Sequence, residues 1–233
     1  MIGEPRTHAA ECESTQLMLG PDDPEGAIAT ADHQTAGRGR LGRRWAEAPG
    51  TSVIVSVLLR PPAERRAPEL SLVAAVAVAR ALDEVTGRPG AQIKWPNDVL
   101  VQGRKVAGIL AEMKGVAVVL GIGINVNQAA DELPEDTKVE AASLRTFDGV
   151  VRDREAVLGT LLRHLDRLYA EWRASGLESL HPELDERDYL SGRHIRAGET
   201  AGVAAGIDRH GRLRIDTPTG PVLVESGEIQ LEP

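Results

Sequence analysis

Residues 92–125 read QIKWPNDVLVQGRKVAGILAEMKGVAVVLGIGIN, a segment in which one β-strand pattern follows another. Apolar and β-branched runs predict strands at 92–95, 99–101, 106–112 and 116–125. Gln102-Gly103-Arg104 has the composition of a hairpin turn between two of them. Because no helical pattern separates these runs, we expect an antiparallel or mixed sheet, and not the parallel sheet of an alternating β-α-β fold.

The flanking sequence supplies helices and further strands. We expect strands at 27–31 and 52–59, a helix that starts at Ser14, helices at 68–86 and 153–174, and a surface loop at 128–152. Ser14 is the expected N-cap of the first helix, since its hydroxyl can accept a hydrogen bond from a free backbone N–H. The helix at 68–86 is apolar on nearly every face, which indicates a buried central helix that ends at Gly87.

The last part of the sequence, residues 191–233, consists of short strand patterns separated by glycines. Asp208-Arg-His-Gly211 and Pro218-Thr-Gly220 have turn compositions. This pattern predicts a small β-barrel. The expected fold class is therefore α+β, with a mixed, largely antiparallel central sheet and flanking helices at 1–188, followed by a small C-terminal barrel at 189–233.

Composition narrows the functional classes. The chain has 233 residues, 42% hydrophobic and 27% charged, with a formal net charge of −8, which argues against broad binding to DNA or to an anionic membrane. No stretch approaches the roughly 18–20 apolar residues of a membrane span, and the N-terminus lacks the apolar core of a signal peptide. Cys12 is the single cysteine, so no internal disulfide is possible and we expect a reducing compartment, the cytoplasm.

One loop concentrates positive charge in this acidic chain. Residues 34–45 read QTAGRGRLGRRW, with four arginines and three glycines between Gly37 and Trp45. Glycines let a backbone approach an anion closely, and arginines offer planar forks that match phosphate or carboxylate oxygens. Trp45 adds a flat apolar face. The loop, called the arginine loop below, therefore predicts an anion clamp with an aromatic lid.

The sequence of the arginine loop admits three other interpretations. Gly37-x-Gly39-x-x-Gly42 formally matches the dinucleotide fingerprint, but that motif requires a following helix, and here Pro49-Gly50 and a strand follow instead. An RNA-binding arginine–glycine segment is usually long and lies in a basic chain, unlike this one. A solvated basic loop without function is the third alternative.

Three further motifs carry chemistry. Lys94-Trp95-Pro96-Asn97-Asp98 ends a strand, because proline cannot donate to a sheet ladder, and its cation, amide and carboxylate can serve phosphate and Mg²⁺. Lys105-Val-Ala-Gly108-Ile-Leu-Ala-Glu112 and Gly121-Ile-Gly123-Ile-Asn125-Val-Asn127 place glycines inside strands, where a ligand or another backbone often approaches. Taken singly, each motif also has a purely structural explanation: a capped turn for the first, a bulge for the second, and a tightly packed strand for the third.

Together, in this order, the four segments resemble the catalytic domain of biotin–protein ligases, over roughly residues 13–233. The resemblance implies the class II synthetase-like fold of biotin/lipoate ligases with an SH3-like C-terminal barrel. Some family members carry an N-terminal DNA-binding domain. Only about 13 residues precede the first matching segment here, so we expect the enzyme-only form with no DNA partner.

The resemblance also implies a reaction. Biotin and ATP form biotinyl-5′-AMP and pyrophosphate, with Mg²⁺ as cofactor, and a lysine of the biotin carboxyl-carrier domain of a biotin-dependent carboxylase then takes the biotin. The catalytic residues implied are Lys105, Arg38 and Asp98, with Asp98 also the metal ligand. Biotin would be bound by Ser14, Thr15, Gln34, Gly37, Arg38, Lys105 and Gly108. ATP and the adenylate would be bound by Arg38, Arg40, Arg43, Trp45, Lys94, Asn97 and Asn125.

One departure concerns Gln16, since many relatives have Ser-Thr-Asn where this chain has Ser-Thr-Gln. Because water would destroy an acyl adenylate, we also expect residues 36–46 to be mobile without ligand and closed with it. Three alternatives stay open: a lipoate or octanoate ligase of related fold, a biotin sensor without catalysis, and an RNA-binding protein.

Overall fold

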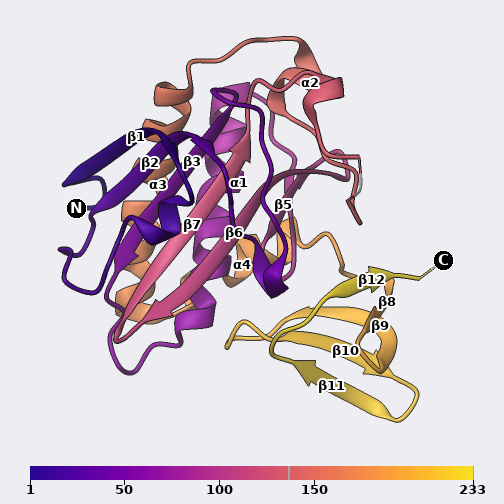
Figure 1. Cartoon of the computed structure of the whole chain (residues 1–233). Coiled ribbons are helices and arrows are strands. Elements are labelled where there is room, and N and C mark those ends of the chain that lie inside the picture. Colours follow the sequence, from indigo (N-terminus) through magenta and orange to yellow (C-terminus); the bar gives the residue numbers. More distant parts are fainter. Residues whose placement is uncertain (136, 233) are drawn as a thin grey trace.

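The computed structural model describes residues 1–135 and 137–232, which form two β-sheets and the helices that flank them (Figure 1). The large sheet has the strand order β1-β2-β3-β7-β6-β5-β4. Its strands are β1 (Arg6–Cys12), β2 (Ile28–Gln34), β3 (Ser52–Leu59), β4 (Ala91–Lys94), β5 (Asp98–Val101), β6 (Arg104–Lys114) and β7 (Ala117–Asn125). β1 runs parallel to β2 and every other pairing is antiparallel, so the predicted mixed, largely antiparallel sheet is confirmed.

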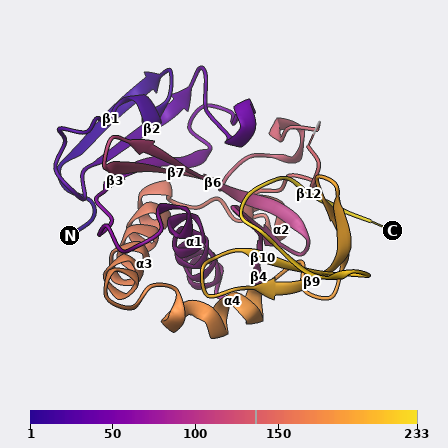
Figure 2. The same ribbon diagram turned by 90° about the horizontal axis from the view of Figure 1, so that it is seen from below.

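The helices lie on one face of this sheet, with α1 (Leu70–Thr86) and α3 (Arg154–Ser175) side by side (Figure 2). α1 is buried along most of its length and ends at Gly87, whose φ of 65° lies in the left-handed region that glycine adopts without strain. The predicted central helix is therefore confirmed. The opposite face of the sheet is contacted by the segment between β1 and β2 and by the loops that follow β2, β4 and β7.

The smaller sheet has the order β11-β10-β9-β8-β12 and is antiparallel throughout. It comprises β8 (His194–Ala197), β9 (Thr200–Ile207), β10 (Leu213–Thr217), β11 (Gly220–Val224) and β12 (Ile229–Leu231). This unit, called the barrel below, agrees with the small C-terminal β domain that the glycine pattern predicts.

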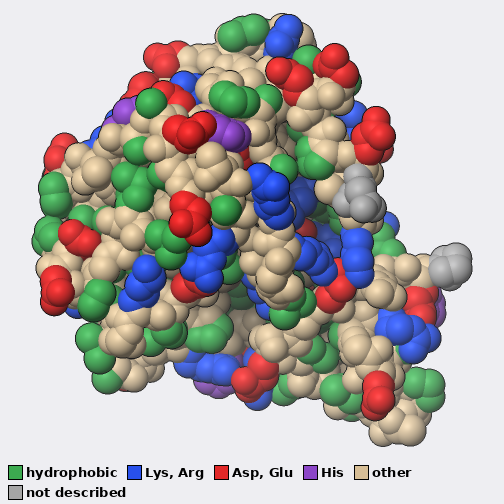
Figure 3. All heavy atoms as spheres, viewed as in Figure 1, with side chains coloured by type: hydrophobic (Ala, Val, Ile, Leu, Met, Phe, Trp, Pro, Cys, Tyr) green, Lys and Arg blue, Asp and Glu red, His purple; other side chains and the backbone are tan. Residues whose placement is uncertain are grey.

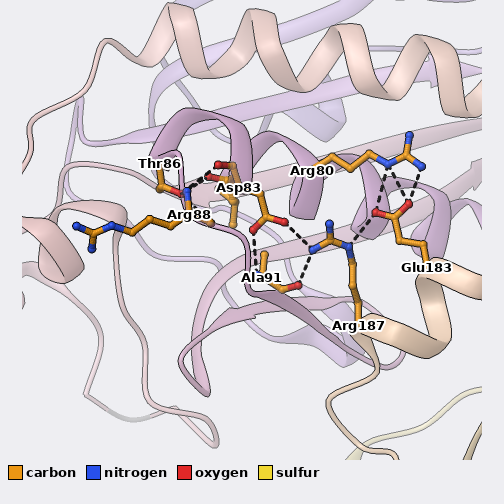
Figure 4. A network of polar contacts seen from close by, with 8 residues as sticks. Arg80, Asp83, Thr86, Arg88, Ala91, Glu183 and Arg187 are labelled. Atoms are coloured by element: carbon orange, nitrogen blue, oxygen red, sulfur yellow. Dashed lines mark hydrogen bonds and ion pairs between the residues drawn. The ribbon is translucent and has the colours of Figure 1, made fainter.

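An ion-pair network fixes α4 (His181–Arg187), the helix before the barrel, against the main domain (Figure 4). The Arg187 guanidinium donates to Asp83 Oδ2 and to the Ala91 carbonyl, both at 2.8 Å. Glu183 accepts from Arg187 Nε at 2.8 Å and from Arg80 Nη2 at 2.6 Å. Burial alone would raise the pKa of Glu183, but its bonds to the two arginines outweigh burial and lower it. The chain therefore enters the barrel from a rigid support.

Several elements differ from expectation. The helix expected at Ser14 is a single 3₁₀ turn, Thr15–Leu17, and the Ser14 side chain makes no capping bond because its hydroxyl donates to Gln34 instead. The loop expected at 128–152 contains a short helix, α2 (Leu144–Asp148), which Ser143 caps by accepting from Thr146 N–H. The edge strand β1 and the helix α4 were not predicted. No helix of the described chain is long and apolar enough to cross a membrane.

Candidate active site

A cavity of about 630 Å³ lies over β3, β6 and β7, between the arginine loop, the β4–β5 turn and the barrel. All the predicted site residues except Gly37 and Asn125 line it. Figure 3 shows Lys and Arg side chains gathered around a hollow between the main body and the barrel. The cavity thus collects residues from segments that are far apart in the sequence.

One end of the cavity, called the ring end, is built from buried uncharged polar groups. The side-chain oxygen of Gln34, Oε1, accepts from Thr15 N–H at 2.9 Å and from the Ser14 hydroxyl at 3.2 Å. Ser14, Thr15 and Gln34 are each at most 5% exposed. Since Gln34 Oε1 is committed in this way, its amide Nε2 is left as the donor, and no acceptor bonds to it within residues 1–135 and 137–232. This end can bind a neutral group that carries both donors and acceptors.

The arginine loop forms the other end of the cavity, called the anion end. The loop folds back on itself, because Trp45 N–H donates to the Gly37 carbonyl and Gly39 N–H to the Arg43 carbonyl. Arg38 pairs with Glu112 at 2.9 Å, and Arg40 Nη1 donates to Asn97 Oδ1 at 3.1 Å. Burial lowers the pKa of Arg40, although Asp98 opposes that effect. The loop therefore presents its cations toward the cavity.

The strands supply two further cations. Lys105 Nζ on β6 lies 2.6 Å from Asp98 Oδ1 at the start of β5. Lys94 at the end of β4 is 8% exposed, and its Nζ donates to the Ile229 carbonyl of the barrel at 3.2 Å. Burial lowers the pKa of Lys94 more than the neighbouring Asp98 raises it. Both lysines are held on strands, so their positions depend less on the conformation of the arginine loop.

Trp45 lies against a pair of glycines that face each other across β6 and β7. Gly108 and Gly123 are partners in the strand register. A Cβ atom at position 123 would lie 2.5 Å from the indole, and one at position 108 would lie 3.0 Å from it. Lys105 Nζ is 5.9 Å from the indole ring centroid. These two glycines are therefore explained by the space that an indole ring requires. The register irregularity of β6 lies at Val106, two residues before Gly108.

Comparison with known proteins gives two family models and several relatives of similar sequence. The model of the biotin/lipoate A/B protein ligase family matches residues 13–128, and that of the biotin protein ligase C-terminal domain matches residues 190–231. The biotin–[acetyl-CoA-carboxylase] ligase of Paracoccus denitrificans is 34% identical, with 96% of this chain and 97% of that protein covered. The chain belongs to the biotin/lipoate A/B protein ligase family. The Mycobacterium tuberculosis protein of the same name is 37% identical, with 89% and 79% covered.

Structural comparison agrees with this membership. The biotin protein ligase from Aquifex aeolicus, solved in complex with biotin and ATP, superposes with a TM-score of 0.89 at 32% identity, and 99% of each chain is covered. The resemblance to biotin–protein ligases and the α+β fold class are thereby confirmed.

Two predicted residues of this biotin/lipoate ligase lie outside the cavity lining. Gly37 is buried, and a Cβ atom there would collide with the Trp45 carbonyl, so its glycine serves the closure of the arginine loop. Asn125 is 5% exposed, and its amide donates to the Ala142 carbonyl at 3.0 Å while its oxygen accepts from Gln128 at 3.0 Å. Their ligand contacts stay predictions.

The structure brings further residues to the site that the sequence motifs did not indicate. Residues 137–142, called the strap, pair with the backbone of Lys105: Lys105 N–H donates to the Glu140 carbonyl and Ala142 N–H to the Lys105 carbonyl, both at 2.8 Å. Glu228 of the barrel pairs with Arg43 and, at 2.6 Å, with Lys138 of the strap. These two cations lower the pKa of Glu228, Lys138 most strongly. Only tertiary contact reveals these residues, because Lys138 and Glu228 stand in no motif.

Proposed function

We propose that this chain is a biotin–protein ligase, which forms biotinyl-5′-AMP from biotin and ATP and transfers biotin to a lysine of a carboxyl-carrier domain. One observation carries the proposal: a buried ring end of hydroxyl and amide groups and a cationic anion end share a single cavity. The Aquifex aeolicus relative, with biotin and ATP bound, supports the same ligand pair.

The ring end is suited to the ureido ring of biotin. Gln34 Nε2 can donate to the ureido oxygen, and the hydroxyl oxygens of Ser14 and Thr15 can accept from the ureido N–H groups. Ile109 and the glycine-lined surface of β6 and β7 supply apolar contact for the rest of the ligand. We assign the biotin-binding role to Ser14, Thr15, Gln34, Gly37, Arg38, Lys105 and Gly108.

The anion end is suited to the first chemical step. A biotin carboxylate oxygen attacks the α-phosphorus of ATP, a bond from that phosphorus to the bridging oxygen breaks, and pyrophosphate leaves. Two anions must approach each other, so cations are needed to offset their repulsion and to stabilise the charge that develops on the α-phosphate oxygens. Lys105 and Arg38 are the residues that we assign to this task, with Arg40, Arg43 and Lys94 along the phosphates. Trp45, Asn97 and Asn125 complete the proposed nucleotide site.

The second step is acyl transfer to an amine. The amine of the carrier lysine attacks the carbonyl carbon of the adenylate, an amide bond forms, and AMP leaves. We assign to Asp98, 2.6 Å from Lys105 Nζ, the tasks of orienting the incoming amine and of accepting its proton.

Mg²⁺ is the cofactor that we propose for the nucleotide. Asp98 and Asn97 are the oxygen ligands that line the cavity, and no group of three acidic, His or Cys side chains that could cage a metal occurs in the described residues. One carboxylate suits a magnesium ion that arrives on phosphate oxygens and keeps several waters. Bound there, the ion would neutralise phosphate charge.

The remaining assignments complete the proposal. We place the domain boundary between residues 188 and 189, after α4 and before the barrel, and the enzyme in the cytoplasm. Glu228 and Ile229 give the barrel a share in the wall of the nucleotide side of the cavity.

Calorimetric titration with biotin, then with biotin plus Mg·ATP, tests the function, with pyrophosphate measured in the same samples. We expect tight biotin binding and one pyrophosphate released per protein molecule before any carrier is added. Biotin binding without pyrophosphate would identify a sensor. Binding and turnover with lipoate in place of biotin would identify a lipoate ligase, and salt-sensitive retention of oligonucleotides on a filter would identify an RNA-binding protein.

A further inference from the structure

Glu112 near the end of β6 lies between two hydrogen-bond donors. Its Oε1 is 2.9 Å from Nη2 of Arg38, and its Oε2 accepts from Gln16 Nε2 at 3.1 Å. A carboxylate offers acceptors on both oxygens, whereas an amide of the same shape offers one acceptor and one donor. An amide in place of Glu112 would therefore turn a donor toward one of these two donors.

Gln16 is held so that its donor side faces Glu112. The side chain is buried, its Oε1 accepts from the Ser56 hydroxyl at 3.0 Å, and its Nε2 also points at the carbonyls of Leu110 and Val119, both at 3.3 Å. Gly121 leaves the space for this longer side chain, since a Cβ atom there would lie 3.1 Å from Gln16 Cδ. The extra methylene of Gln16 thus has a structural use: it carries the amide to Glu112.

The same contacts connect the ring end with the anion end. The Ser56 hydroxyl donates to Gln16 Oε1 at 3.0 Å and lies 2.8 Å from the Thr15 hydroxyl, which is also 3.3 Å from Gln34 Oε1. Polar contacts therefore continue from Thr15 through Ser56 and Gln16 to Glu112, which also holds Arg38.

We propose that Glu112 is a positioning residue for Arg38, and that Gln16 holds Glu112 in place for this task. Arg38 lies between two glycines on a loop and is 44% exposed, so its guanidinium needs an external support to keep one orientation. Glu112 holds one edge of the guanidinium through Nη2, which leaves the other N–H groups for the ligand anion. The proposal rests on the proposed function, in which Arg38 acts on the carboxylate and the α-phosphate.

A double-mutant cycle tests the proposal. We expect Glu112→Gln to lower the rate of pyrophosphate release by about 10- to 100-fold with biotin affinity changed less than about 3-fold, since misplacing a catalytic group costs rate before it costs binding. In an Arg38→Ala background the same substitution should cost less than about 2-fold, because the group through which Glu112 acts is gone. Gln16→Met, which keeps the shape and removes the donor, should show the same pattern with a smaller loss.

Glu155→Gln is the matched control, because Glu155 also pairs with an arginine, Arg6, at 2.7 Å, but far from the cavity; it should leave the rate unchanged. An equal fold loss from Glu112→Gln with and without Arg38, or no loss at all, would overturn the proposal.

Wild-type protein without pyrophosphate release would instead refute the proposed function. In that case, hydrogen exchange of the arginine-loop amides in the ligand-free protein still tests whether Glu112 holds Arg38. Glu112→Gln should speed exchange at residues 36–46, and unchanged exchange would contradict the proposal.

Discussion

The two ends of the cavity bind by different physical means. At the ring end, polar side chains at most 5% exposed bond to one another on fixed backbone positions, so the pattern of donors and acceptors is set before any ligand arrives. At the anion end, the side chains of Arg38, Arg43 and Lys138 are 44%, 53% and 54% exposed, and each pairs with a carboxylate of the protein. Under the proposed function, the ring end would recognise a neutral ring by geometry, whereas the anion end would exchange carboxylate partners for phosphate.

The largest effect is expected at the anion end. Lys105→Met keeps the length of the side chain and removes the cation that lies on β6 beside Asp98. We expect pyrophosphate release to fall by about 10²- to 10³-fold, in the range for loss of one charge-stabilising donor. Biotin affinity measured by calorimetry should change far less, and unfolding temperature should stay the same. A loss of biotin affinity as large as the loss of rate would show that the two ends are not separate.

A smaller effect is expected at the ring end. Thr15→Val removes a buried hydroxyl that bonds to Ser56 and leaves polar neighbours without a partner. We expect biotin affinity to fall about 10-fold, because the ureido N–H that the Thr15 hydroxyl would accept is left without a partner in the complex, which costs on the order of 1–3 kcal/mol. The rate at saturating biotin should be nearly unchanged. Thr160→Val on α3, outside the cavity, is the control.

The dependence of binding on salt concentration also distinguishes the two ends of the cavity. Raising NaCl should weaken ATP binding strongly, since exposed charges are screened. It should weaken biotin binding less, in both wild type and Thr15→Val, because biotin brings a single carboxylate and a neutral ring. Equal salt dependence of the two ligands would remove the distinction between the ends.

The smallest effect is expected where the arginine loop rejoins β2. The Glu47 side chain is fully buried, Gln34 N–H donates to its Oε1 at 2.8 Å, and no partner bonds to its Oε2 within residues 1–135 and 137–232. Burial raises the pKa of Glu47, although Gln34 and His33 oppose the shift. The folded state therefore favours the protonated carboxyl, which stabilises the fold at low pH. This stabilisation is lost as pH rises through the raised pKa.

Glu47→Gln supplies the neutral form at every pH. At pH 7 we expect it to raise the unfolding temperature by about 3 °C, the shift for about 1 kcal/mol in a chain of this size. The gain should shrink toward pH 4, where wild-type Glu47 is itself protonated. Glu13→Gln, at an exposed position beside the ring end, is the control. A gain that grows as pH falls would reverse the assigned sign.

Local patterns predicted the parts of the fold that are buried and regular. β3 falls on the expected residues 52–59, because each of its side chains is buried and apolar or small. β1 was missed, since its sequence RTHAAEC has neither alternation nor a β-branched run, and its position is set by parallel pairing with β2. α2 was missed because its five residues are too few to show helical periodicity.

The candidate site divides in the same way. Motifs placed the arginine loop, Lys94, Asp98 and Lys105 in one site, and the cavity contains them. The carboxylate partners of Arg38 and Arg43 were not predicted, because Glu112 and Glu228 become neighbours of the arginine loop only through the sheet register and the barrel. Sequence spacing gives no measure of such contacts.

The attachment of the strap to Lys105 allows the side chains of the strap to change during evolution without moving Lys105. The strap is held by backbone groups of Lys105, and backbone pairing does not depend on side-chain identity. Thr137, Lys138 and Val139 line the cavity, yet none of them contributes the bonds that hold the strap to Lys105. Their side chains can therefore diverge, and with them the charge and shape of this wall of the cavity, while Lys105 keeps its place on the strand.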